Sequence, residues 1–191
     1  MNTLLRTLFL ITLALAAGAC KSAGRTTEVS ARSGEVLYSR VGMHFEANRG
    51  SYVMRSTNHV ELPKYVPPGS RFTVSDIDRK AVTLQGDDNA TYVITYVQNH
   101  SMMPMAEWIE KWFAASPVEL PADLTAEERD AIGQGVCRDG MSRRAVFLAI
   151  GYPPKSLNPS DEDDTLTYEA RRFVRRQVEF DDQGRVVRYG R

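Results

Sequence analysis

Apolar and polar residues alternate in short runs along the first half of the chain, and this alternation predicts β-strands. Turn-forming residues separate the runs, which lie at 36–41, 51–54, 71–74, 81–84 and 91–96. No helical period interrupts them. Strands this short and regularly spaced predict a small open barrel of SH3-like size.

Two later stretches have helical spacing. In the first, apolar residues recur at Met105, Trp108, Ile109 and Trp112. An aromatic stripe of this period predicts a helix whose face is buried in the core; the alternative is an exposed binding surface. Glu107 and Lys111 are spaced to pair on its other face. The second stretch opens with Thr125-Ala126-Glu127-Glu128, a capping box, and should end near 133–135.

A third helix is predicted after Ser142, whose hydroxyl can cap the first turn. Gly140 allows a tight entry into this helix, Gly151 can take a left-handed conformation at its end, and Pro153 prevents its continuation. A helix this short needs a sheet to pack on. Alternating residues predict that sheet at 165–170, 174–180 and 185–189, with a turn at 181–184. Two helices followed by an antiparallel sheet are typical of an α+β arrangement.

The order and spacing of these signals resemble the BamE-type (SmpA/OmlA) domain of outer-membrane lipoproteins. The resemblance covers roughly residues 124–189, and the residues that carry it are Gly140, Met141, Ser142, Val146, Gly151, Pro153 and Tyr168. It implies an α-α-β-β-β fold and a non-enzymatic role in the outer-membrane envelope, such as support of β-barrel assembly. Unlike a family member that is mostly this one domain, the chain has a β-rich segment before it.

The first twenty residues have the pattern of an export signal. Arg6 precedes a short apolar run, which is too short to span a bilayer, and three small residues then stand directly before Cys20. This end resembles a lipobox, which implies acylation of Cys20 and a lipid anchor; the alternative is an ordinary signal peptide that contains a cysteine. Lys21 follows, with no aspartate to signal retention in the inner membrane. We therefore expect a lipoprotein of the outer membrane that faces the periplasm.

Composition excludes some classes of partner. The chain has 24 basic and 24 acidic residues, so it lacks the basic excess that nucleic-acid binding requires. The sequence has two cysteines. If Cys20 is acylated, Cys137 has no partner for a disulfide, and we expect it to be buried among apolar neighbours.

No catalytic, cofactor or metal site is predicted. The three histidines, His44, His59 and His100, have no metal-ligand spacing, and no GxSxG motif or P-loop is present. Residues 161–164 are all acidic but lack the spaced ligands of an EF-hand loop, so a solvated loop is expected. We therefore do not expect an enzyme.

A basic cluster is the candidate for interaction with a partner. Its residues are Arg171, Arg172, Phe173, Arg175 and Arg176. Guanidinium groups around an aromatic ring suit phospholipid phosphates or an acidic protein patch. The alternative is that they project outward and pair with Glu169, Glu179 and the acidic loop.

Together these signals predict an α+β chain: a small β-rich, SH3-like segment followed by an α-α-β-β-β BamE-like domain. The expected boundaries are a signal peptide at 1–19, a flexible tether at 20–34, a β-rich domain at 35–116 and the second domain at 117–191. The expected function is that of a membrane-anchored, non-catalytic module that binds envelope or outer-membrane proteins. The alternatives are a peptidoglycan-binding module and a lipoprotein that inhibits an enzyme, for which a protruding loop with an exposed aromatic residue would be the sign.

Overall fold

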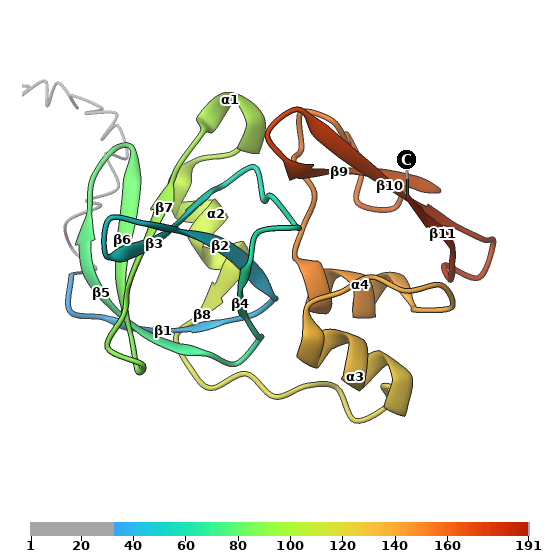
Figure 1. Ribbon diagram of the computed structural model, residues 1–191, viewed down its shortest axis with the longest axis horizontal. Helices are drawn as coiled ribbons and strands as arrows, with labels where there is room; N and C mark the ends of the chain where they lie inside the picture. The colour runs from blue at the N-terminus through green and yellow to red at the C-terminus, as the bar shows by residue number, and fades with distance from the viewer. Residues whose placement is uncertain (1–32, 191) are drawn as a thin grey trace, which may run out of the picture.

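The computed structural model describes residues 33–190. Cys20, the expected signal peptide at 1–19 and most of the expected tether at 20–34 lie outside the described residues. The described chain has two parts that pack against each other, an eight-stranded sheet with two short helices and a three-stranded sheet with two further helices (Figure 1).

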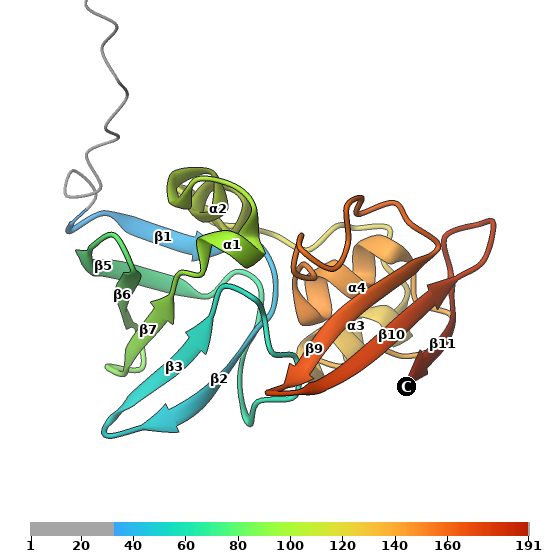
Figure 2. The same ribbon diagram turned by 90° about the horizontal axis from the view of Figure 1, so that it is seen from above.

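The larger sheet curls around its own core. Its strands are β1 (Val36–Ser39), β2 (Met43–Asn48), β3 (Ser51–Arg55), β4 (Lys64–Val66), β5 (Arg71–Ile77), β6 (Ala81–Gly86), β7 (Thr91–Thr95) and β8 (Phe113–Ala114). They are ordered β4-β2-β3-β7-β6-β5-β1-β8. All neighbours are antiparallel except β3 and β7, which run parallel (Figure 2). Strict alternation of buried and less buried residues in β6 and β7 turns one face of the sheet inward.

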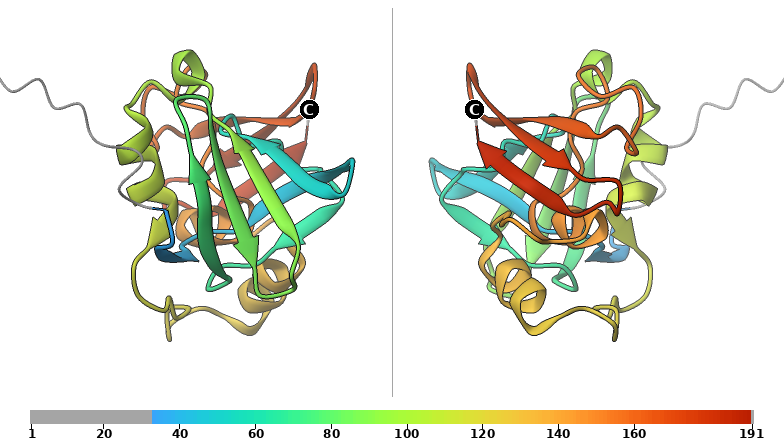
Figure 3. Two further views of the ribbon diagram at one scale, coloured as in Figure 1. Left: turned by 90° about the vertical axis from the view of Figure 1, so that its left-hand side faces the viewer. Right: turned by 90° about the vertical axis from the view of Figure 1, so that its right-hand side faces the viewer.

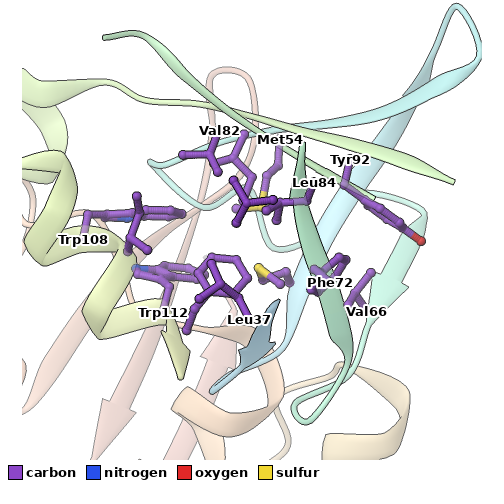
Figure 4. Close-up of a cluster of buried hydrophobic side chains, with 14 of the residues drawn as sticks. Leu37, Met54, Val66, Phe72, Val82, Leu84, Tyr92, Trp108 and Trp112 are labelled. Carbon is purple, nitrogen blue, oxygen red and sulfur yellow. The ribbon is translucent and has the colours of Figure 1, made fainter. Parts of the chain in front are cut away.

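Helix α2 (Met105–Trp112) completes this core; it follows the single turn α1 (Gln98–Ser101). The apolar stripe expected for α2 is buried, which confirms its assignment to the core. Trp108 and Trp112 stack with ring centroids 5.0 Å apart. Both rings reach among the strand side chains, including Leu37 (Figure 4). Lys111 donates to Asp161 rather than to Glu107, with Nζ 2.7 Å from Oδ2.

The second part contains helices α3 (Ala126–Gln134) and α4 (Arg143–Ile150) and strands β9 (Thr165–Arg171), β10 (Val174–Phe180) and β11 (Val186–Gly190). Both predicted helix starts are confirmed: Thr125 and Glu128 form a capping box, and the Ser142 side chain accepts from the amide of Ala145. Gly151 has a positive φ of 75° with a ψ of −172°, so it ends α4 in a conformation that suits glycine but differs from the left-handed helical one.

Buried polar contacts join the two parts. The Asn58 side-chain amide donates to the carbonyls of Ile150 and Tyr152, at 2.7 and 2.9 Å, where α4 ends. A Cβ on Gly151 would lie 2.9 Å from that amide nitrogen and 2.8 Å from the Trp112 ring. Only glycine at position 151 leaves room for the backbone to approach Asn58 and Trp112 this closely. We call this contact region the junction.

The predicted fold class is wrong. Eight of the eleven described strands form one large curled sheet, so the chain is β-rich and is not a small β segment followed by an α-α-β-β-β domain of an α+β protein. The sequence pattern missed β2 because its burial does not alternate, and it missed β4 because this strand has only three residues. The parallel contact of β3 with β7 depends on packing that no local pattern reports.

Candidate interaction site at the β9–β10 hairpin

The predicted basic cluster lies at the tip of a β-hairpin. Strands β9 and β10 are antiparallel, and Arg172 and Phe173 form the turn between Arg171 and Val174. The pairing register shifts between Val174 and Arg175. Such a bulge increases local twist and can re-aim side chains. The hairpin tip rises clear of the rest of the molecule (Figure 3).

Phe173 is presented to solvent in an unfavourable backbone conformation. Its φ is 64°, and 91% of its surface is exposed. A left-handed backbone is uncommon for a bulky residue, and an exposed ring contributes little hydrophobic stabilisation. The Arg172 guanidinium lies 4.8 Å from the ring centroid, in a contact that is itself exposed. Folding of the described chain therefore gains little from this side chain at this position.

The four arginines divide into two pairs. Arg176 lies 2.8 Å from a Glu61 carboxylate oxygen through Nε, and Arg171 lies 3.7 Å from the other oxygen of the same carboxylate. Arg172 and Arg175 are exposed, and within residues 33–190 neither is paired with a carboxylate. Two guanidinium groups, on residues that precede and follow Phe173 in the sequence, therefore remain available.

The partners expected for the arginines are occupied by other groups. Glu169 Oε2 lies 2.9 Å from the His59 ring, and Glu179 contacts Arg188. In the acidic loop, Asp161 accepts a hydrogen bond from Lys111 and forms an ion pair with Lys155. Burial alone would raise the pKa of Asp161, but these two ammonium groups lower it overall. The loop is thus partly tied to the protein rather than fully solvated.

Residues from the first part of the chain brace the hairpin. The amides of Val60 and Glu61 donate to the carbonyls of Glu169 and Ala170 at 3.0 and 2.9 Å. The segment at 59–61 lies beside β9, and His59 and Glu169 form a parallel β-bridge. His59 and Glu61 are the members of the site that the sequence did not indicate, because their contact with residues 169–176 spans more than 100 positions. A hairpin held on its edge in this way loses little conformational freedom on binding.

The seven motif residues lie away from the tip and have structural roles. Five of them flank α4 (Gly140, Met141, Ser142, Gly151 and Pro153), and Val146 is buried within it. The seventh, Tyr168, is fully buried and donates from its hydroxyl to the Gly151 carbonyl at 3.0 Å. Ser142 also donates its amide to a Glu128 carboxylate oxygen at 2.8 Å. Their side chains and backbone therefore build the support on which β9 and β10 rest.

Other predicted chemistry can be placed only in part. Cys20 lies outside the described residues. Cys137 is buried as expected, and burial raises its pKa to about 12, which keeps the thiol protonated. Among residues 33–190, no three His, Cys, Asp or Glu side chains gather as a metal site would require. None of the helices in this range combines the length and the apolar character needed to cross a membrane.

Comparison with known proteins adds no assignment to this geometry. The chain matches no known protein family, no curated protein and no solved structure.

Proposed function

We propose that this protein is a non-catalytic binding module whose β9–β10 tip inserts into an acidic cleft of a partner protein in the cell envelope. The observation that carries this proposal is Phe173, a fully presented aromatic ring in a left-handed conformation between two unpaired arginines. Aromatic and arginine side chains are the residues that most often dominate protein interfaces.

The surroundings of the tip favour a protein partner over a lipid surface. Arg171 and Arg176 pair with Glu61, and β9 is braced by residues 59–61, so the hairpin that carries the tip has a set position. A set position suits a shaped cleft, whereas a fluid headgroup layer does not need it.

An enzyme-inhibiting lipoprotein is a special case of the same proposal. Its expected sign was a protruding loop with an exposed aromatic residue, and the β9–β10 tip has this form (Figure 3). In that case the acidic cleft would be an active site, and binding would be competitive with substrate.

The proposed location rests on the N-terminal sequence. The apolar run and the three small residues before Cys20 support acylation of that thiol and attachment to the outer membrane. Several acyl chains anchor a protein stably, and the residues that follow would place the folded part at the membrane surface.

Site-specific photo-crosslinking tests the proposal in intact cells. A benzophenone amino acid replaces Phe173 in one strain, and Val187 in a control strain, because Val187 is a second exposed apolar side chain, 55% exposed, on β11. We expect one defined protein adduct from position 173 and none from 187. Reversing the charge with Arg172→Glu and Arg175→Glu should abolish that adduct. Fractionation of wild type beside Cys20→Ala tests the anchor separately.

Three outcomes would overturn the proposal. Adducts to lipid at position 173 would mean that the tip contacts the membrane instead. Equal adducts at 173 and 187 would mean contact without a defined site, and an adduct that survives charge reversal would exclude an acidic cleft. If Cys20→Ala remains as firmly bound to membranes as wild type, the lipid anchor is wrong, whatever the tip binds.

A further inference from the structure

A second concave site lies apart from the tip, in the eight-stranded sheet. A cleft of about 390 Å³ is formed by β4, the start of β5 and the turn between β6 and β7. The connection from β4 to β5 and the β6–β7 turn lie at the lower edge in Figure 1, whereas the β9–β10 tip lies at the upper edge. This volume is in the range of small-molecule sites.

The rim of the cleft carries both signs of charge. Arg71 and Asp87 form one pair, with 2.7 Å between nitrogen and oxygen, and Lys64 and Asp88 form another at 3.3 Å. All four side chains are about one third to two thirds exposed. Exposed ion pairs contribute at most about 1 kcal/mol, so a ligand that supplies the same charges can replace either partner at little cost.

One carboxylate of the rim is held in a fixed orientation. Asp88 accepts from the amide of Ala90 at 3.1 Å and from the Tyr92 hydroxyl at 2.7 Å. Burial alone would raise the pKa of Asp88, but these bonds and Lys64 lower it overall, so it stays ionised. A Cβ on Gly86 would lie 2.6 Å from Asp88 and 2.8 Å from the Tyr92 ring, so glycine is needed for this arrangement.

Buried aromatic rings lie beneath these charges: Phe72 and Tyr92, which line the cleft, are each 2% exposed. Tyr92 stacks on Tyr52 with centroids 5.3 Å apart and meets Phe72 edge to face at the same distance. The hydroxyl of Tyr92 points away from the buried cluster that holds its ring (Figure 4). Lys64 Nζ lies 5.0 Å from the Tyr52 ring centroid. The cleft thus has a rim with two cations and two anions above aromatic rings that are almost wholly buried.

We infer that this cleft binds a short peptide that presents both a free carboxylate and a free ammonium group. The carboxylate meets the planar fork of Arg71, which suits two parallel hydrogen bonds. The ammonium lies between Asp87 and Asp88. Free peptides carry these two groups at their ends, whereas the stem peptides of peptidoglycan carry a terminal carboxylate and an ammonium group on the diamino acid side chain, so the two sources share this chemistry.

Titration of isotope-labelled protein with defined peptides tests the inference. Trialanine with both ends free should shift the amide resonances of Ser70 and Ala90, which flank the cleft, with saturation in the millimolar range or below. Trialanine that is acetylated at one end and amidated at the other should bind at least tenfold more weakly. Soluble muropeptides form a further arm: tighter binding than trialanine identifies the cell wall as the source, and weaker binding identifies free peptides.

Matched variants distinguish the cleft from general charge effects. Arg71→Gln and Asp87→Asn should each weaken trialanine binding at least tenfold, because each removes one charge that the ligand needs. Arg79→Gln, in the β5–β6 turn at the other end of the same strands, and Asp182→Asn, in the β10–β11 turn, remove the same charges elsewhere and should change nothing. All four positions are exposed, so folding is retained.

Equal binding of free and blocked trialanine would overturn the inference, as would the absence of saturable shifts up to about 10 mM. Unchanged binding by both cleft variants would also overturn it. Because the tip and the cleft have no residue in common, failure here leaves the tip proposal standing, and the reverse also holds.

Discussion

At the scale of one residue, Phe173 is a side chain that does not stabilise the folded state. Its ring is exposed, and its backbone lies where glycine or asparagine is usual. A left-handed conformation costs an ordinary L-residue about 1 kcal/mol or more. The contact with Arg172 is an exposed one and returns only part of this cost. Residues that are strained and exposed in this way mark sites where binding, rather than folding, uses the side chain.

Replacing Phe173 with glycine should therefore separate stability from binding. We expect Phe173→Gly to be as stable as wild type or up to about 1 kcal/mol more stable, because glycine adopts a positive φ without strain. Urea unfolding followed by tryptophan fluorescence measures this change. Phe180→Ala is the comparison, since Phe180 on the same strand is buried and its loss should cost about 3 kcal/mol. A clear loss of stability in Phe173→Gly would show that the ring serves the fold.

At the scale of elements, Glu128 connects three segments of the second part. One carboxylate oxygen accepts from the Thr125 amide at the start of α3, at 3.1 Å. The other accepts from the Ser142 amide at the start of α4, at 2.8 Å, and from Arg185 before β11, at 3.4 Å. The side chain is buried, so these donors would lack a partner without it.

We expect Glu128→Gln to lower the free energy of unfolding by about 2 kcal/mol, because an amide nitrogen would then face a backbone donor and the charge beside Arg185 would be lost. Glu127→Gln is the matched control: Glu127 is exposed in the same first turn, and its replacement should cost less than about 0.5 kcal/mol. Chemical denaturation of both variants is the measurement. Equal effects would mean that only the helix dipole matters and that Glu128 does not connect the segments.

The elements also show what local pattern can predict. Alternation located β6 and β7, and capping residues located the starts of α3 and α4, because these signals lie within a few positions of each other. The parallel pair β3–β7 and the brace at residues 59–61 were not predictable, since each depends on contacts between distant segments. For the same reason the basic cluster was found in the sequence, but the role of Glu61 in fixing half of it was not.

At the scale of the whole molecule, His44 reports on contact between the two parts. It lies on β2, its ring centroid is 5.0 Å from that of Tyr65, and its Nδ1 has no hydrogen-bond partner within residues 33–190. Tyr65 in turn donates to the Ile132 carbonyl at 2.5 Å, near the end of α3. Burial lowers the pKa of His44 to about 4, partly opposed by a hydrogen bond with the Gly135 backbone.

This lowered pKa predicts a loss of stability in mild acid. The unfolded chain binds a proton at His44 below about pH 6.5, whereas the folded chain does so only near pH 4. Stability should therefore fall as the pH drops from 6.5 to 4, by up to about 3 kcal/mol. His44→Gln should lose this part of the pH dependence, and urea unfolding of both proteins across the interval measures it. Parallel pH profiles would show that His44 is not kept neutral by the fold.

The junction at Asn58 has a mechanical consequence. Opening the molecule there would break the two hydrogen bonds from the Asn58 amide to the carbonyls of Ile150 and Tyr152, at a net cost of about 0.5–1.5 kcal/mol each. These hydrogen bonds therefore oppose bending between the two parts, and we expect the two parts to move as one rigid body. A pull on the β9–β10 tip would be transmitted across the junction to the far end of the large sheet, so anything held in the cleft stays at a constant distance and orientation from whatever the tip holds.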